Sequence, residues 1–393
     1  MEWLQNPLVM AGVAIAVALG GILTTCAYLI LLERKLSAWM QDRLGPNRVG
    51  PAGLLQPLAD GAKLILKEDV IPGHVNKFLF ILGPALSVFT TMLAFAVVPF
   101  GPVSHEPGQF PFVIAPGIDL GIVFIFAVTS LSVYSIILGG WASNNKYSAL
   151  GSLRASAQVV SYEIPLGMSV VGIALLHSSM SLEKILLQQA EMGFLGWNIW
   201  YQPVACLIFF TAALAESNRL PFDLTECEQE LVGGFHTEYS AMKWAMFFLG
   251  EYTHVITISF LTSVLFLGGW HFPFIAEANS AYAGAWAVKV AVLLFKVSCM
   301  IVLIQMLRWT IPRFRFDQLM SLAWKGLIPM ATANVLIVMC VLEFQLPRLW
   351  LLPLSLLLFV AVGLIGTQAS LPAGATTVRR KKTAVPAVAA AHH

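Results

Sequence analysis

Carboxylates gather in one stretch of this chain, between residues 215 and 251. Seven of the 21 acidic residues lie there, together with one arginine, Arg219. Because apolar segments long enough to cross a bilayer flank this stretch, its acids lie at membrane depth or beside it. Charge in such a place is costly and usually marks a path for ions or protons. The seven residues are Glu216, Asp223, Glu226, Glu228, Glu230, Glu238 and Glu251.

The spacing within this stretch predicts a short helix. Asp223 fits its N-cap, Glu226 stands at the third position of a capping box, and Gly233-Gly234 ends it. Asp223 and Glu238 are the acids most easily explained as helix caps or solvent-facing groups. The others cannot all ionise in a dry setting, so proton binding becomes a property of the group, with Arg219 as the counter-charge.

Other charges fall inside apolar segments. Glu163 lies two residues before Pro165, where we predict a break in the helix. Lys289 and Lys296 lie two turns apart on one helical face, and Asp119 lies at the start of another apolar segment. Lysines at such positions more often extend toward the membrane surface than line a pathway. Together these charges predict a hydrated polar line from the acidic stretch toward the middle of the membrane.

The elements that position these groups are membrane-spanning helices. The chain is 58% hydrophobic and 11% charged, with a mean hydropathy of +0.78, whereas soluble domains are about 25% charged. We therefore predict an all-α polytopic membrane protein with about nine transmembrane helices in one membrane domain, residues 1–370, and a disordered basic tail, residues 371–393. The predicted spans are 7–32, 78–100, 118–140, 159–178, 198–216, 244–268, 286–307, 327–345 and 349–367.

The lysines and arginines predict the orientation. If alternate connections are assigned to one side, all but four of the 23 basic residues fall there; Lys184 and Arg348 lie on the other side, and Lys289 and Lys296 lie within a span. This bias predicts a periplasmic N-terminus and a cytoplasmic tail in a bacterial inner membrane. The first span is not expected to be a cleaved signal peptide, because it is too long and follows Glu2 without a basic residue.

A second pattern lies in the long connection after the first span. Residues 54–69, LLQPLADGAKLILKED, carry leucines and isoleucine on one helical face and Asp60, Lys63 and Lys67 on another. About 11 residues are too few to span, so we predict an amphipathic helix at the cytoplasmic interface. A surface helix that merely anchors a loop is the alternative that the pattern leaves equally open.

Several kinds of chemistry find no support. The five cysteines are scattered without a CxxC, and neither GxGxxG after a strand nor GxxxxGK[ST] occurs. We expect no metal, dinucleotide or ATP site on this chain, no nucleic-acid partner and no Ser–His–Asp catalysis. If the protein serves a redox process, the redox cofactors are expected on partner subunits.

Three blocks of sequence carry a family resemblance: residues 33–68, ERKLSAWMQDRLGPNRVGPAGLLQPLADGAKLILKE; residues 215–252, which contain the acidic stretch; and residues 308–329, RWTIPRFRFDQLMSLAWKGLIP. Together they resemble the membrane subunit of respiratory complex I, the family of the H subunit of bacterial NADH–quinone oxidoreductase and of its mitochondrial counterpart, subunit 1. Family members usually end after eight spans, so the resemblance implies no role for the ninth.

The resemblance implies a subunit of a proton-pumping NADH:quinone oxidoreductase. Such a subunit lies in the lipid bilayer beside quinone-site peripheral subunits, antiporter-like subunits and small membrane subunits; FMN and iron–sulfur clusters belong to partners, and quinone is the substrate. The quinone tunnel would include Arg34, Gln41, Arg43, Asp60, Lys63, Phe235, Arg308 and Arg313. The proton-coupling chain would be Glu216, Glu226, Glu228, Glu230, Glu251 and Glu163, with Arg219 as modulator.

Two alternatives remain open at this point. One is the homologous membrane subunit of a hydrogenase or formate-linked complex, which tends to lack the block at residues 45–68 that is intact here. The other is a stand-alone ion-coupled secondary transporter, which inverted repeats would favour. Co-purification with iron–sulfur subunits would distinguish an oxidoreductase component from a transporter.

Overall fold

The computed structural model describes residues 7–102, 112–223, 232–277 and 284–370. Within these ranges the regular elements are helices, joined by loops and one isolated bridge between Phe272 and Ala276. Seven helical segments in the described part are long and apolar enough to span a membrane, and two shorter apolar helices accompany them. This architecture confirms the predicted all-α polytopic fold.

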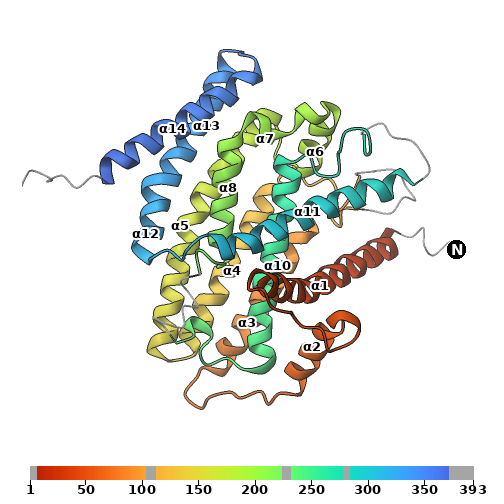
Figure 1. The fold of residues 1–393 in the computed structure, drawn as a ribbon, viewed down its shortest axis with the longest axis vertical. Coiled ribbons are helices and arrows are strands. Elements are labelled where there is room, and N and C mark those ends of the chain that lie inside the picture. Colours follow the sequence, from red (N-terminus) through yellow and green to blue (C-terminus); the bar gives the residue numbers. More distant parts are fainter. Residues whose placement is uncertain (1–6, 103–111, 224–231, 278–283, 371–393) are drawn as a thin grey trace, which may run out of the picture.

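Helices occupy all nine predicted ranges (Figure 1). Short helices connect them: α2 (Gln56–Leu66), α6 (Leu182–Glu191) and α7 (Asn198–Tyr201). A π-helical turn, Leu322–Leu327, joins α12 to α13. The principal helices are α1 (Pro7–Met40), α3 (Lys77–Leu93), α4 (Gly121–Ala142), α5 (Lys146–His177), α8 (Pro203–Glu216), α10 (Ala241–Phe266), α11 (Ala285–Thr310), α12 (Phe316–Ser321), α13 (Ile328–Glu343) and α14 (Leu351–Ser370).

The predicted span over 198–216 differs from the structure at its start. Helix α7 stops at Tyr201, Gln202 leaves the helical conformation, and α8 begins at Pro203. The residue before a proline is disfavoured in the helical region, whereas proline itself suits the first helical position. The remaining α8 has 14 residues, about 21 Å at 1.5 Å per residue, so it is shorter than the hydrocarbon core.

Helix α10 is the centre of the bundle. The most apolar stretch of α10 is 83% buried, a larger share than in any other spanning helix of the described residues. Yet α10 is the least apolar of these seven helices. Its buried hydroxyls donate to carbonyls one turn back on the same helix, as Thr253 does to Leu249 and Thr257 to Thr253. A polar helix is shielded from lipid when its neighbours surround it, and this places its polar side chains inside the protein.

Helices α3 and α4 approach each other closely beside α10. A Cβ on Gly83 of α3 would lie 3.3 Å from the backbone nitrogen of Gly139 on α4, so small residues let the two backbones meet. Helices α1 and α11 run at a slant to the more upright α8 and α10, and α2 lies beside the end of α1 (Figure 1). Leu58, Ile65 and Leu66 of α2 are exposed.

Candidate functional site

A buried carboxylate on α1 is contacted by two arginines and one tyrosine from three other parts of the chain. Glu33 is only 8% exposed, although it lies in the last third of a 34-residue helix. Its Oε1 contacts Arg308 of α11, and its Oε2 lies 3.4 Å from Nη1 of Arg219, which follows α8. The Tyr252 hydroxyl on α10 donates to the same Oε2 at 2.6 Å. One anion held by two guanidinium groups is a strong, oriented arrangement.

Arg219 also stacks on an aromatic ring. Its guanidinium carbon lies 4.0 Å from the centre of the Tyr252 ring, a cation–π contact that fixes the arginine above α10. Arg219, Glu33 and Tyr252 therefore form a single packed unit. Arg219 thus contacts a carboxylate on α1, Glu33, which lies outside the acidic stretch at residues 215–251.

This unit forms one wall of a polar cavity of about 590 Å³. The cavity is lined by charged groups from α1 and the turn after it, from α10 and α11, and from the segment after α8. Its charged lining residues are Glu33, Arg34, Arg43, Arg219, Asp223, Glu251 and Arg308. Of the predicted tunnel residues, the cavity thus collects Arg34, Arg43 and Arg308, together with Glu251 and Arg219 of the predicted coupling chain.

An apolar cavity of about 240 Å³ adjoins the polar one. It lies between α1, α2 and α10 and shares Ile30, Arg34, Phe248 and Tyr252 with its neighbour. Asp60 of α2 lines it and accepts a hydrogen bond from Arg34 at 2.6 Å. The predicted interfacial helix thus forms a wall of this cavity. Paired apolar and charged compartments suit a ligand with a greasy tail and a polar head.

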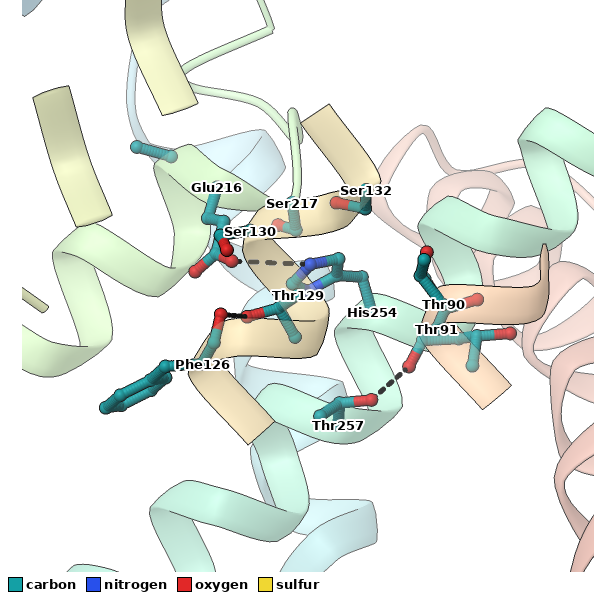
Figure 2. A network of polar contacts seen from close by, with 12 residues as sticks. Thr90, Thr91, Phe126, Thr129, Ser130, Ser132, Glu216, Ser217, His254 and Thr257 are labelled. Atoms are coloured by element: carbon teal, nitrogen blue, oxygen red, sulfur yellow. Dashed lines mark hydrogen bonds and ion pairs between the residues drawn. The ribbon is translucent and has the colours of Figure 1, made fainter. Parts of the chain in front are cut away.

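A third group of polar residues lies deeper in the bundle (Figure 2). Glu216, at the end of α8, is buried, and its Oε1 lies 3.5 Å from Nε2 of His254 on α10. Thr129 of α4 borders a small cavity together with Glu216 and His254, and Glu163 of α5 lies within electrostatic range of Glu216. Two small cavities, of about 30 and 10 Å³, are both lined by Glu216 and His254.

Glu251 connects the polar cavity with this deeper group. It lines the 590 Å³ cavity and also the 30 Å³ cavity that contains Glu216 and His254. Asn218 lines the same two cavities. A row of polar side chains therefore runs from the Glu33 unit through Glu251 to Glu216.

Three other predicted tunnel residues line neither of these two cavities but contact residues that do. Gln41 accepts a hydrogen bond from Arg43 at 2.7 Å, and Nζ of Lys63 lies 3.9 Å from Asp60. Arg313 pairs with Asp223 at 3.2 Å. Phe235 lies elsewhere, in a cluster with Phe80, Tyr239 and Phe247, and borders the 30 Å³ cavity.

Three predicted members of the coupling chain, Glu226, Glu228 and Glu230, lie outside the described residues, as does the short helix predicted there. Glu238, predicted as a cap or solvent-facing acid, accepts a hydrogen bond from Asn145 at 2.7 Å.

The comparisons with known proteins identify the family. A sequence profile described as NADH dehydrogenase matches residues 13–339. This chain belongs to the NADH dehydrogenase family. It is 47% identical over 343 residues to an H subunit (number 2) of NADH-quinone oxidoreductase from Koribacter versatilis, covering 84% of this chain and 96% of that protein. The H subunits of NADH-quinone oxidoreductase from Flavobacterium psychrophilum and Leptospira biflexa are each 46% identical, covering 80% and 84% of this chain and 91% and 93% of their own lengths.

The match to the NADH dehydrogenase family spans every block on which the resemblance was based, and stops before α14. Among the described residues, no group of three histidine, cysteine or acidic side chains is arranged to hold a metal ion.

Other charges that the sequence placed on the polar line lie away from this row of side chains. Lys296 donates to the carbonyl oxygens of Leu267 and His271, at 2.6 and 2.7 Å, and lies over the Trp197 ring. It thus satisfies one carbonyl at the end of α10 and one in the loop that follows, and it does not extend the predicted polar line. Burial and the charge of Lys296 lower the pKa of His271 in the adjoining loop. Asp119 pairs with Lys184 on the surface, and the lysine lowers the pKa of the Asp119 carboxyl.

The sequence reasoning missed Glu33, Tyr252 and His254. Glu33 opens the triplet Glu33-Arg34-Lys35, which resembles the charged end of a span, and only the continuation of α1 to Met40 encloses it. His254 could have been predicted from the sequence, because it follows Glu251 by three residues and so shares a helix face with it.

Proposed function

We propose that this chain is the H subunit of a proton-pumping NADH-quinone oxidoreductase, in which it forms the quinone entrance and passes the effect of quinone reduction to buried carboxylates. The observation that carries the proposal is the junction of the two cavities at Arg34 and Tyr252. Quinones have an apolar tail and a polar head, so the tail would fit the apolar cavity and the head the adjoining polar cavity. The names of the relatives support the same assignment.

The coupling step is electrostatic. Reduction of quinone changes the charge in the polar cavity, where Glu33, its two arginines and Glu251 respond. At an effective dielectric constant of about 20, two unit charges 4 Å apart interact by about 4 kcal/mol, enough to move a proton between neighbouring acids. The proton change then passes from Glu251 to Glu216 and onward to Glu163. Glu226, Glu228 and Glu230 are proposed members of the chain by resemblance.

In this proposal the chain has a periplasmic N-terminus and a cytoplasmic entrance, with α2 at the membrane interface. Peripheral subunits that carry FMN and iron–sulfur clusters would cover the polar cavity, and antiporter-like subunits would receive the proton signal. Neither a hydrogenase-linked complex nor a lone transporter has a specific observation in its favour.

Photolabelling tests the quinone entrance. A photoreactive quinone analogue applied to the assembled complex is expected to label peptides from α1, α2 and α10, and excess natural quinone should suppress the label. Labelling confined to other helices of this chain, with the same suppression by quinone, would contradict the proposed entrance.

The coupling role is tested by Glu216→Gln in the assembled complex. Proton translocation in sealed vesicles should fall while the amount of assembled complex stays near the wild-type level. Glu343→Gln, the same change at an exposed acid at the end of α13, is the control. Wild-type translocation in the glutamine variant would exclude Glu216 from the pathway.

A further inference from the structure

His254 is a buried histidine whose ring nitrogens are not hydrogen-bonded. Its side chain is 9% exposed, and neither Nδ1 nor Nε2 has a hydrogen-bond partner. Among the described residues, the other buried histidine in a spanning helix is His177, whose two ring nitrogens are hydrogen-bonded to Gln188 and Asn198 at 2.7 and 2.9 Å. Leaving buried polar atoms without partners costs free energy, so the arrangement at His254 requires an explanation.

The surroundings of His254 contain two acids and many hydroxyls. Nε2 faces Oε1 of Glu216 at 3.5 Å, and Glu251 lies three residues earlier on the same face of α10. All three line the 30 Å³ cavity, which is large enough for a single water molecule. The remaining polar groups that line it do not titrate near neutral pH: Ser87, Thr91, Ser132, Ser135, Ser217 and Asn218.

We infer that His254 is a proton-relay residue that carries protons between Glu251, at the edge of the quinone cavity, and Glu216, in the interior of the bundle. The inference rests on the proposed function and adds to it a group that is not a carboxylate. Imidazole suits this position because one ring nitrogen can accept a proton while the other donates one.

Each transfer conserves protons and charge. Glu251 loses its carboxyl proton, directly or through one water, and an N–H bond forms on Nδ1 of His254. The Nε2–H bond then breaks as an O–H bond forms on Oε1 of Glu216. The imidazole is neutral again, as its other tautomer, and either a turn of the ring or the return of a proton restores the first.

Two measurements on the assembled complex test the relay. In sealed vesicles, His254→Asn should lower NADH-driven proton translocation at least about tenfold without lowering the amount of complex, because asparagine cannot pass a proton through its side chain. With ring-labelled histidine, the infrared difference spectrum on reduction by NADH should contain a label-sensitive imidazole band. That band should vanish in His254→Asn and persist in His177→Asn.

The results separate this inference from the proposed function. If Glu216→Gln blocks translocation while His254→Asn pumps normally, the coupling role stands and the relay is wrong; if both pump normally, both are wrong. The relay is also wrong if the wild-type complex has no label-sensitive imidazole band, a result that does not depend on any variant assembling. His254→Gln provides a second variant should the asparagine variant assemble poorly.

Discussion

The Tyr252 hydroxyl on α10 donates a 2.6 Å hydrogen bond to Glu33 on α1. The two helices that this bond joins wall both the apolar and the polar cavity. The contact therefore sets how far apart the walls stand where the two cavities meet. It also orients the aromatic face on which Arg219 rests.

Tyr252→Phe should slow quinone reduction without preventing assembly. The variant keeps the ring under Arg219 and loses only a hydrogen bond to a charged group, which is worth about 1.5–3 kcal/mol. Steady-state NADH:quinone kinetics should show a severalfold lower kcat/KM for quinone. Tyr134→Phe, on an exposed tyrosine of α4, is the matched control. Equal kinetics in the two variants would exclude a role for this hydroxyl.

Glu33→Gln should strongly reduce the amount of assembled protein. Removing the carboxylate leaves Arg219 and Arg308 facing a neutral group in a buried site, and breaking such a pair costs about 3–5 kcal/mol. The amount of this chain in purified membranes measures the effect, with Glu343→Gln, at an exposed acid, as the control.

A second substitution tests the cause of that loss. The double variant Glu33→Gln with Arg308→Gln should assemble better than Glu33→Gln alone, because one uncompensated charge is removed. A double variant that assembles worse would indicate that the two residues contribute through packing and not through their charges.

The sequence could predict only part of the fold and of the site. The acidic stretch, the helical fold and α2 follow from composition and periodicity, because about 20 apolar residues in a row have few alternatives in a membrane. Glu33 could not be placed, since its burial depends on the tilt and length of α1 and on partners 186 and 275 residues away. Tertiary packing, which leaves no local pattern, decides such positions.

The break at Gln202 and the isolation of Lys296 have a similar cause. Proline at 203 was visible in the sequence, but apolar character on both sides favoured one continuous span. The sequence grouped Lys296 with the acids because a charge inside a span needs opposite charges or water nearby. In the structure, one backbone carbonyl at the end of α10 and one in the following loop satisfy it. Every loop has backbone carbonyls, whatever its residues, so the sequence alone cannot show which carbonyls a buried lysine will contact.

Gly250→Ala should destabilise the packing of α10 against α3. A Cβ at this position would lie 2.3 Å from the Ser87 hydroxyl oxygen, and overpacking of this kind costs about 1–3 kcal/mol. The thermal stability of the purified complex should fall. Adding Ser87→Ala should restore most of it, because the next nearest atom, the Ser87 Cβ, would be at 3.5 Å. Destabilisation that persists in the double variant would contradict this steric cause.

Arg34→Gln should raise the KM for quinone and leave kcat and assembly near wild type. Arg34 and Asp60 stand where α1 meets α2, with side chains 43% and 21% exposed, and partly exposed ion pairs contribute only about 0–1 kcal/mol to stability. Their effect should therefore appear in quinone access and binding, because both line the apolar cavity. Lys184→Gln removes a comparable exposed pair, with Asp119, far from the cavities, and should change neither constant. A lower kcat with unchanged KM in Arg34→Gln would instead place this arginine in the step after quinone has bound.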